Sequence, residues 1–237
     1  HLPYYRESMF PPMVVDNERF ILKPMNCPHH IRIYKVRPRS YRELPLRLAE
    51  FGTVYRYEKS GQLMGLSRVR GMTINDAHIF CTEEQLESEI RAVLELTQRV
   101  YRTLGLKEYW IDLALHDPKK RKKYADQPAL WKKSEDALRA ALQHAGVTFT
   151  EVAGDAAFYG PKADIQMKDA AGHTFTMSTI QLDMLLPERL DVNYTSVNGK
   201  ASRPILIHRA PIGTSERFIA FLIEHFEGKF PLWLAPI

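Results

Sequence analysis

The hydrophobic and polar positions of residues 47–78 alternate with the two-residue period of β-strands. RLAEFGTVYRYE and MTINDAH predict two antiparallel strands, joined by the Gly-rich loop KSGQLMGLSRVRG. Side chains two residues apart share a face of a strand, which groups the following residues: Arg56 with Glu58, and Met72 with Ile74, Asp76 and His78. Charged side chains are poorly suited to a dry core because each would need a polar partner there. The face is therefore either functional or the solvated side of an ordinary hairpin, and the spacing alone leaves both interpretations open.

Three stretches have the spacing of amphipathic helices. Thr82 and Gln85 form a capping-box pattern in front of the first, and Thr214 or Ser215 caps the last. The predicted helices span 83–104, 129–145 and about 214–227.

The remaining apolar segments are short and are separated by turn signals such as DAAG and the Asn198-Gly199 pair. They predict a short helix at 29–36 and strands at 18–23, 108–115, 147–152, 163–169, 173–183, 192–197 and 203–209. Hairpins in series with interspersed helices argue for an α+β fold, with a mainly antiparallel sheet flanked by helices. Because no repeat or linker interrupts the pattern, we expect one domain over 1–237.

The composition is that of a folded globular chain, with 45% hydrophobic and 26% charged residues. The net charge of +5 is compatible with a polyanionic partner but is weak evidence for one. Two cysteines make no disulfide framework, and no segment approaches the roughly 18 apolar residues of a membrane span. We therefore expect a cytoplasmic protein without a membrane partner. The chain begins at His1 without a Met and ends after an apolar run, which suggests a piece of a longer protein.

The segment 119–123 is a dense run of positive charge. A solvated surface loop is the ordinary interpretation of such a run, and contact with nucleic-acid phosphates is the alternative.

Two groups of residues could bind a phosphate. Arg56 and Glu58 lie beside the arginine-bearing loop; Arg is well shaped to hold a phosphate bidentately, and a carboxylate can accept from an exocyclic amine. In GTSERF, Gly213 precedes a predicted helix N-terminus, which favours anions, and Arg217 lies in its first turn. A glycine before a capped helix is also common without any ligand, and Arg217 could be an ordinary surface residue.

Cys27, His78 and His208 are candidate metal ligands. Sulfur and nitrogen donors suit zinc, and three protein ligands would leave one coordination position for a substrate. The three residues are far apart without a finger-like spacing, and nine His residues make a chance combination easy. The other candidate donors are His29, His30 and Cys81.

Several segments resemble one enzyme family. TVYRYE followed by GLSRVRG resembles motif two of the class II aminoacyl-tRNA synthetases, and GTSERF resembles motif three. The segments that resemble the catalytic domain of the threonyl-tRNA synthetase family occur in its order over almost the whole chain: LKPMNCPHH, YRELPLRLAEFG, NDAHIFCTEEQ, FYGPK, QLDM, LIHRAPIG and FPLWLAP. The resemblance implies the class II catalytic fold and an AMP-forming ligase, which activates L-threonine with ATP and transfers it from threonyl-adenylate to the 3′ end of tRNA-Thr.

In that family a zinc ion is held by the Cys of the PMNCP loop and by the His of the DAHIF and IHRA segments, which match Cys27, His78 and His208. The resemblance implies that threonine offers its amino nitrogen and hydroxyl to Zn2+, and that Asp76 accepts from the hydroxyl. A site built around a hydroxyl rejects valine, which lacks one. Serine retains it, so we expect poor discrimination against serine; the family's separate editing domain is not found in the sequence.

The resemblance also implies an ATP site. Arg56 would clamp the α-phosphate, Arg68 would hold the γ-phosphate, and Glu58 would read the adenine amino group, with Mg2+ accompanying the phosphates. The remaining nucleotide contacts would come from Met72, Gln181 and Arg217.

Further roles follow from the same match. Tyr159 and Lys162 of FYGPK resemble family residues near the amino and carboxylate ends of the substrate, and Lys162 would act in catalysis with Arg56 and Arg217. His1 falls where the family has a histidine that helps to take a proton from the terminal ribose of tRNA.

Some positions depart from the family. Where Phe-Thr-Gln-Asp-Asp-Ala-His is common, this chain has MTINDAH at 72–78, and Ile74 in place of Gln removes a polar contact near the substrate. Thr176 and Ser178 stand where Gln and Gly are frequent, so that Thr176 affects one nucleotide contact. Motif one, the dimer-interface segment of the class, and the anticodon-binding domain are not found in the sequence. We expect a homodimeric parent, with this piece dimerising less readily and recognising tRNA weakly.

Two alternatives stay open. A seryl- or prolyl-type class II enzyme does not share the Cys/His/His set, so stoichiometric zinc that is lost in a Cys27→Ser variant would count against it. A non-catalytic paralogue that binds tRNA or amino acid as a regulator or decoy is kept open by Ile74 and Thr176, but it has no physical need for both Arg56 and Arg217.

Overall fold

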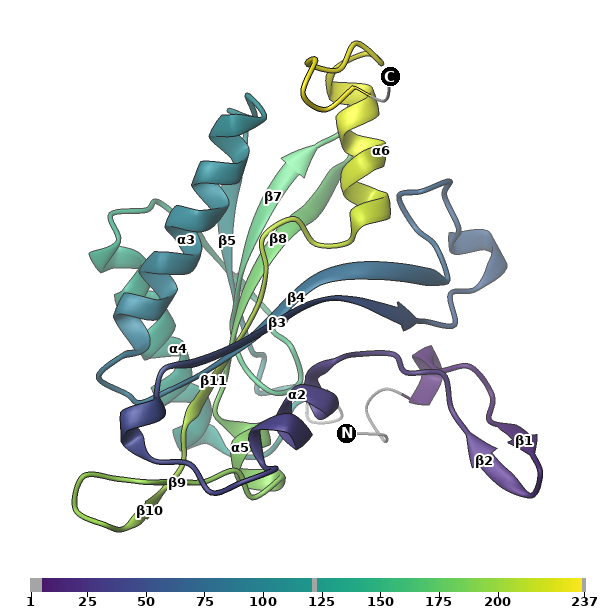
Figure 1. Ribbon diagram of the computed structural model, residues 1–237. Coiled ribbons are helices and arrows are strands. Elements are labelled where there is room, and N and C mark those ends of the chain that lie inside the picture. Colours follow the sequence, from purple (N-terminus) through teal and green to yellow (C-terminus); the bar gives the residue numbers. More distant parts are fainter. Residues whose placement is uncertain (1–5, 121–122, 236–237) are drawn as a thin grey trace.

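A seven-stranded sheet forms the centre of the computed structural model, which describes residues 6–120 and 123–235 (Figure 1). In spatial order its strands are β3 (Leu46–Tyr55), β4 (Gly71–Cys81), β11 (Ile205–Ala210), β8 (Thr174–Asp183), β7 (Lys162–Lys168), β5 (Trp110–Leu115) and β6 (Thr150–Ala153). Each neighbouring pair is antiparallel except β5 and β6, which are parallel. The prediction of a mainly antiparallel sheet with helices is therefore confirmed.

The helices are α2 (Cys27–Tyr34), α3 (Leu86–Thr103), α4 (Pro128–His144), α5 (Leu185–Arg189) and α6 (Ser215–His225). Single-turn 3-10 helices occur at Arg6–Ser8, Tyr41–Glu43 and Ser60–Gln62. Two small hairpins lie outside the main sheet, namely β1 (Met13–Val15) with β2 (Glu18–Phe20), and β9 (Tyr194–Thr195) with β10 (Ala201–Ser202). Within the part of the chain that the structure describes, no helix combines the length and apolar character needed to cross a membrane.

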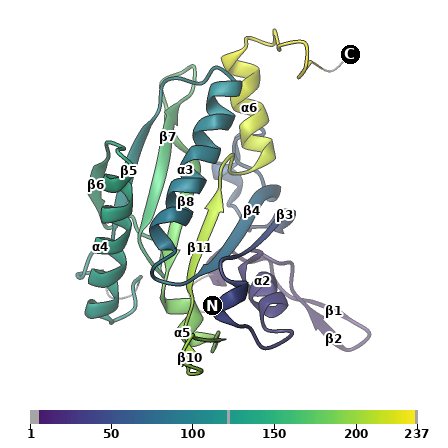
Figure 2. The same ribbon diagram turned by 60° about the vertical axis from the view of Figure 1, so that its left-hand side comes forward.

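The main core lies between one face of the sheet and the helices α3 and α4, which lie side by side (Figure 2). The apolar positions of α3 recur every three or four residues, so Leu86, Ile90 and Leu94 all face the sheet. They pack against alternate residues of the strands, such as Ile79 and Ile207. This packing stabilises the centre of the sheet on one side only.

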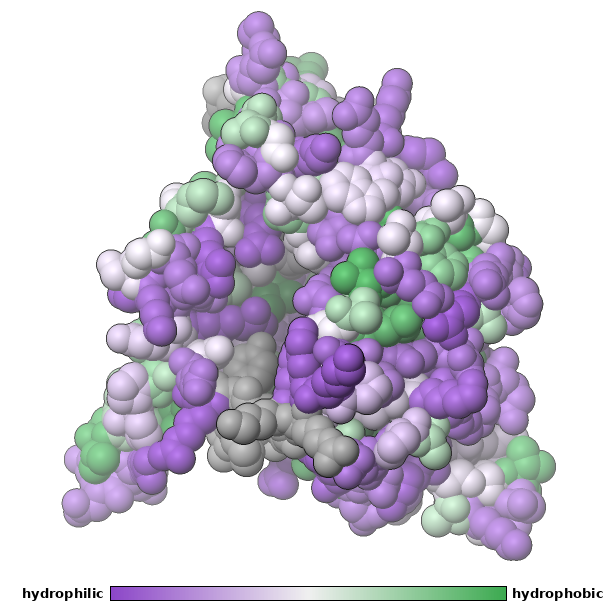
Figure 3. Space-filling model, turned by 180° about the vertical axis from the view of Figure 1, so that it is seen from behind, coloured by the Kyte–Doolittle hydropathy of each residue, from purple (hydrophilic) through white to green (hydrophobic). Residues whose placement is uncertain are grey.

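The opposite face is covered at one end by α2. Ile31 and Tyr34 of this helix pack on Phe80 and Leu206, which are the sequence neighbours of the core residues Ile79 and Ile207 and therefore point the other way. The rest of this face carries polar side chains. Seen from behind, the molecule is hollowed near its centre, and hydrophilic side chains line most of the hollow (Figure 3).

Several predicted boundaries were wrong. The strand predicted at 18–23 is β2, which pairs only with the exposed β1, and the strand predicted at 192–197 shortens to the two residues of β9. The helix predicted at 29–36 begins earlier, at Cys27, and α5 was not predicted because Pro187 interrupts its pattern. The Thr82–Gln85 pair forms a turn, in which the Gln85 side chain accepts from the Thr82 amide, and α3 begins after it.

The basic run at 119–123 lies partly outside the described residues. Lys120 and Lys123 both donate to the carbonyl oxygen of Gly154, at 3.4 and 3.2 Å. These two lysines therefore hold the loop against the turn after β6, and contact of the run with nucleic acid stays a prediction.

Candidate active site

Four predicted site residues lie in one row across the sheet. His78 pairs with His208 in the β4–β11 register, His208 pairs with Gln181 on β8, and Gln181 pairs with Lys162 on β7. Paired residues of neighbouring strands point to the same face of a sheet. The register therefore brings together side chains from four distant segments on the face opposite to α3.

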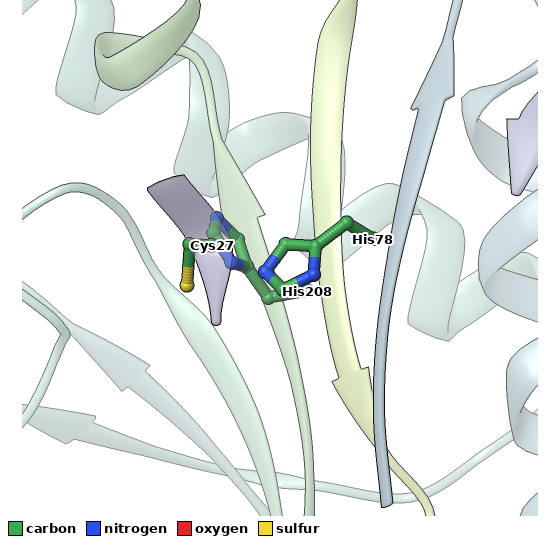
Figure 4. Close-up of side chains that lie close together, drawn as sticks. All are labelled: Cys27, His78 and His208. Atoms are coloured by element: carbon green, nitrogen blue, oxygen red, sulfur yellow. The ribbon is translucent and has the colours of Figure 1, made fainter. Parts of the chain in front are cut away.

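Cys27, the first residue of α2, completes a cluster with the two histidines. The sulfur and one nitrogen of each ring all lie within 4.8 Å of one another, and all three side chains are buried. Figure 4 shows them converging from α2, β4 and β11. Two nitrogen donors and one sulfur donor are a ligand set that suits zinc, and three protein ligands would leave a fourth coordination position for a substrate.

The hydrogen bonds around the cluster fit a metal ion. Among the described residues, the Nε2 atom of His78 and the Nδ1 atom of His208 are the buried side-chain nitrogens without a hydrogen-bond partner. Unpaired buried nitrogens are rare because they cost free energy, whereas ligation of a metal would satisfy both. The residues present therefore fit the zinc ion that the resemblance implies.

Burial lowers the pKa of His78 well below its usual value, so this ring is neutral, as a metal ligand must be. Burial also disfavours protonation of His208, but the charge of Cys27 and the hydrogen bond to Asp183 outweigh it and raise the pKa of His208 to about 10. A protonated His208 carries a proton on both ring nitrogens, so a metal ion that binds its Nδ1 would have to displace the proton there.

Asp76 lies beside the cluster, two residues before His78 on the same face of β4. Its Oδ2 accepts from the Nδ2 of Asn26 at 3.1 Å, and Asn26 in turn accepts from Lys23 at 2.8 Å. Burial raises the pKa of Asp76, although the bond from Asn26 opposes this. A half-buried carboxylate with one bonded oxygen is well placed to accept from a small hydroxylated ligand.

Gly52 permits this arrangement, although the sequence pattern did not predict a role for it. A Cβ atom on Gly52 would lie 2.4 Å from the Nδ2 of Asn26 and 2.8 Å from the Cδ of Glu50. The AEFG segment therefore needs its glycine so that the loop before α2 can lie directly on β3.

Tyr159 and Lys162 lie on the other side of the cluster. The Tyr159 ring stacks on His208 with centroids 4.8 Å apart, and its hydroxyl donates to Gln181. Lys162 forms ion pairs with Asp164 and Asp155. Burial alone would lower the pKa of Lys162, but the charge of Asp164 outweighs it and raises the pKa, so Lys162 keeps its positive charge.

Three arginines gather farther along the same face. Arg217 donates to the carbonyls of Ser67 and Thr176, at 2.9 and 3.4 Å. Burial and then the positive charges of Arg68 and Arg56 lower the pKa of Arg217, so the three guanidinium groups lie within range of one another's charge. A hollow of about 320 Å³ lies beside Arg68 and Arg217. This arrangement attracts a polyanion.

Glu58 provides the negative charge in this region. Its Oε2 accepts from Arg68 at 3.1 Å, while Met72 is buried on β4. Glu58 and Arg68 were predicted to contact different parts of a nucleotide, and here they contact each other. A nucleotide bound in the predicted way would have to separate them.

The segment GTSERF holds the start of α6 against β4. Gly213 has a φ of +61°, and a Cβ there would lie 2.6 Å from the carbonyl oxygen of Met177. Thr214 caps the helix by accepting from the Arg217 amide. Both carboxylate oxygens of Glu216 accept from the amide of Thr73 at 3.0 Å. Glu216 was not predicted to act, because its partner lies on a strand that is remote in sequence.

A model of the "tRNA synthetase class II core domain (G, H, P, S and T)" matches residues 12–226. The chain belongs to this family.

The relatives of this class II core include the threonine–tRNA ligases of Thermus thermophilus, 55% identical over 241 residues, and of a Geobacillus species, 52% identical over 237 residues. The alignments cover 100% of this chain and 36% and 37% of those proteins. The chain thus spans little more than a third of the length of these relatives.

Two solved structures are similar to it over 100% of its length. One is titled as the RNA binding domain of the threonyl-tRNA synthetase of Cryptosporidium parvum (42% identity, TM-score 0.91, 58% of that chain), and the other is a putative threonyl-tRNA synthetase of Aeropyrum pernix (34%, 0.83, 54%). The prolyl-tRNA synthetase of Giardia lamblia, at 16% identity and a TM-score of 0.67 over 94% of this chain and 38% of that one, shares the fold.

The departures from the family pattern have different surroundings in this class II core. Thr176 donates to the Oε1 of Gln166 at 3.0 Å on the facing strand. Ser178 is buried and bonds the Tyr101 hydroxyl and the Pro211 carbonyl, so it serves packing. Ile74 bridges to Thr214 through the backbone, and nothing in the structure explains its side chain.

The other candidate ligands of this class II core lie outside the cluster formed by Cys27, His78 and His208. His29 is exposed, and Cys81 is buried in the core on the opposite face, where burial raises the pKa of its thiol to about 12. His30 contacts His78 from outside the cluster. His1 lies outside the described residues.

Proposed function

We propose that this chain is the catalytic domain of a threonine–tRNA ligase, which uses ATP to form threonyl-adenylate and transfers threonine to tRNA-Thr. The observation that carries the proposal is the convergence of Cys27, His78 and His208 beside Asp76, on the same face as three clustered arginines. The names of the similar full-length relatives support the choice of threonine. We also propose that residues 1–237 act as one domain of a cytoplasmic protein and that the whole protein is a homodimer.

Threonine selection would depend on a zinc ion held by Cys27, His78 and His208. When bound, the zinc would offer open coordination positions to the amino nitrogen and the hydroxyl of threonine. Asp76 would accept the hydroxyl proton in a hydrogen bond and so orient the side chain. Valine has no hydroxyl, so it would leave the zinc ion and Asp76 without this partner. Leaving such groups unsatisfied costs far more binding free energy than the loss of an apolar contact.

ATP would bind along the arginine cluster. Arg56 would contact the α-phosphate, Arg68 would exchange Glu58 for the γ-phosphate, and Glu58 would then accept from the adenine amino group. The other nucleotide contacts would come from Met72, Gln181 and Arg217, and Mg2+ would bind the phosphates. A threonine carboxylate oxygen would attack the α-phosphorus, and pyrophosphate would leave. Arg56 and Arg217 would stabilise the negative charge that develops on the phosphate oxygens.

The two substrates would meet at Lys162. Its charge, kept by Asp164, would hold the threonine carboxylate near the α-phosphate, and Tyr159 would orient the amino end of the substrate. In the second step, His1 would help to remove the proton of the terminal ribose of tRNA.

The test is amino-acid-dependent exchange between ATP and pyrophosphate. We expect rapid exchange with threonine, slower exchange with serine, and little with valine or proline. Arg56→Ala should lower the threonine rate by about 100-fold or more, because each donor to the developing charge contributes on this scale. Arg91→Ala, which removes a surface arginine of α3 that pairs with Glu87, is the matched control and should leave the rate unchanged. Exchange that is as fast with proline or valine as with threonine would overturn the proposal.

A further inference from the structure

The two metal-facing histidines each leave one particular nitrogen without a partner, the Nε2 of His78 and the Nδ1 of His208. A neutral imidazole has one N–H and one lone pair, and only the lone pair can bind a metal. Whether these two nitrogens carry lone pairs depends on where the proton sits on the other nitrogen of each ring. The groups that contact those other nitrogens therefore decide whether the site can bind a cation.

For His208 the deciding group is Asp183. Its Oδ2 lies 2.9 Å from the Nε2 of His208, and its Oδ1 is occupied by the amides of Leu185 and Leu186 at the start of α5. A carboxylate accepts hydrogen bonds, so the Nε2 keeps its proton, and when a metal ion displaces the proton of the Nδ1, the lone pair of that atom points toward Cys27 and His78.

For His78 no carboxylate makes a direct hydrogen bond within the described part of the chain. The Nδ1 of His78 lies 2.7 Å from the Nδ1 of His30, and the Nε2 of His30 lies 3.0 Å from the Oε1 of Glu50. The nearest oxygen of Asp76 is 3.8 Å from the Nδ1 of His78, beyond hydrogen-bond distance. His30 therefore stands between the ligand and a carboxylate.

The direction of these two hydrogen bonds follows from Glu50. Because Glu50 can only accept, the Nε2 of His30 donates to it, and a metal ion on the Nε2 of His78 then requires the Nδ1 of His30 to act as the acceptor toward the Nδ1 of His78. The Nδ1 of His78 must donate to that acceptor, which leaves the lone pair of His78 on Nε2. This is the atom that has no partner inside the cluster.

We propose that Glu50 and His30 form a relay that fixes the tautomer and orientation of His78, and that His30 is a positioning residue for the metal centre. The inference rests on the proposed function, since it takes the cluster to be a zinc site. Glu50, His30 and His78 belong to three different elements, β3, α2 and β4, so the relay also ties these elements together around the site.

The short helix α2 is suited to both tasks. Cys27 and His30 are three residues apart and lie on the same side of the helix. The His30 ring is buried and meets the His78 ring edge to face, with centroids 4.7 Å apart. One helix thus supplies a ligand and the group that orients a second ligand.

The experiment measures the zinc dissociation constant of the full-length protein by competition with a chromophoric chelator. His30→Phe keeps a ring of similar size but removes both nitrogens, and we expect zinc to bind about 10- to 100-fold more weakly, the range found when a group that orients a metal ligand is lost. His30→Asn places an amide oxygen at the position of Nδ1, so it can still accept from His78. We expect this variant to recover most of the affinity.

The matched control is His116→Phe. His116 is half-buried and, like His30, bonds a carboxylate, with its Nδ1 2.7 Å from the Oε1 of Glu135, but its ring contacts Tyr124 and Trp131 rather than the cluster. The zinc affinity of this variant should equal that of the wild type.

The outcomes distinguish a failure of the proposed function from a failure of the relay. Wild-type protein that binds no zinc overturns the proposed function and this inference together. Zinc that binds to wild type and to His30→Phe with equal affinity overturns the relay alone. Equal weakening in His30→Phe and His30→Asn also overturns it, because the loss would then come from packing and not from the acceptor.

Discussion

At the scale of single residues, Asp76 is a position where a role in substrate binding can be tested separately from a role in the structure. Asn26 bonds one of its oxygens, and the other lies 3.8 Å from the Nδ1 of His78. The carboxylate is half-buried and is not itself in the Cys27–His78–His208 set. A change at this position should therefore alter substrate selection without removing the metal.

We predict that Asp76→Asn lowers kcat/KM for threonine activation by about 10- to 100-fold, because a hydrogen bond to a charged group contributes about 1.5–3 kcal/mol. The amide has nearly the same shape, so bound zinc should stay at the wild-type level. Pyrophosphate exchange and zinc analysis on the same preparation would check both statements. Asp136→Asn, at an exposed position of α4, is the control. Loss of zinc together with activity would show that Asp76 supports the metal instead.

At the scale of elements, the segment before α2 packs directly on β3. This contact is possible because residue 52 is a glycine and has no side chain. Asn26 is fully buried above Gly52, and Glu50 lies on the same strand two residues away. The interaction joins the segment that carries Cys27 to the hairpin that carries Asp76 and His78. Small displacements here should affect the site more than they affect the fold.

We predict that Gly52→Ala raises KM for threonine about 10-fold, while the protein still folds, because loss of one hydrogen bond to a charged group is of this order. The new methyl group would displace Asn26, whose Nδ2 lies 2.4 Å from its position, and would break the Asn26–Asp76 hydrogen bond. Steady-state exchange kinetics and thermal unfolding would separate the two effects.

Gly61→Ala is the control for this prediction, because a Cβ there meets nothing within 4 Å. An unchanged KM in Gly52→Ala would mean that the loop accommodates the methyl group and that Asn26 does not position Asp76.

At the scale of the whole molecule, a twisted sheet with one covered face gathers residues that are remote in sequence. The long amphipathic helices and most strands could be predicted, since α3, α4, β4 and β8 have strong local periodicity. The parallel β5–β6 pair could not, because parallel strands are joined through α4 and no local signal specifies their pairing.

The same distinction applies to the site. Cys27, His78 and His208 were indicated by motif resemblance, and the register of β4 with β11 gives the physical reason why the two histidines meet. Asn26, His30 as an orienting residue, Gly52 and Glu216 were missed. Each acts through a contact with another segment that is remote along the chain, such as Glu216 with Thr73, and such contacts have no sequence period.

The dependence of threonine activation on the metal tests the account most directly. The measurement is threonine-dependent exchange between ATP and pyrophosphate before and after removal of zinc with a chelator, with Mg2+ in excess, and again after zinc is restored. We predict that exchange is lost with the zinc and returns with it, because Cys27, His78 and His208 alone offer no partner for the threonine amino group and hydroxyl. Undiminished, threonine-selective exchange in the zinc-free protein would contradict the account.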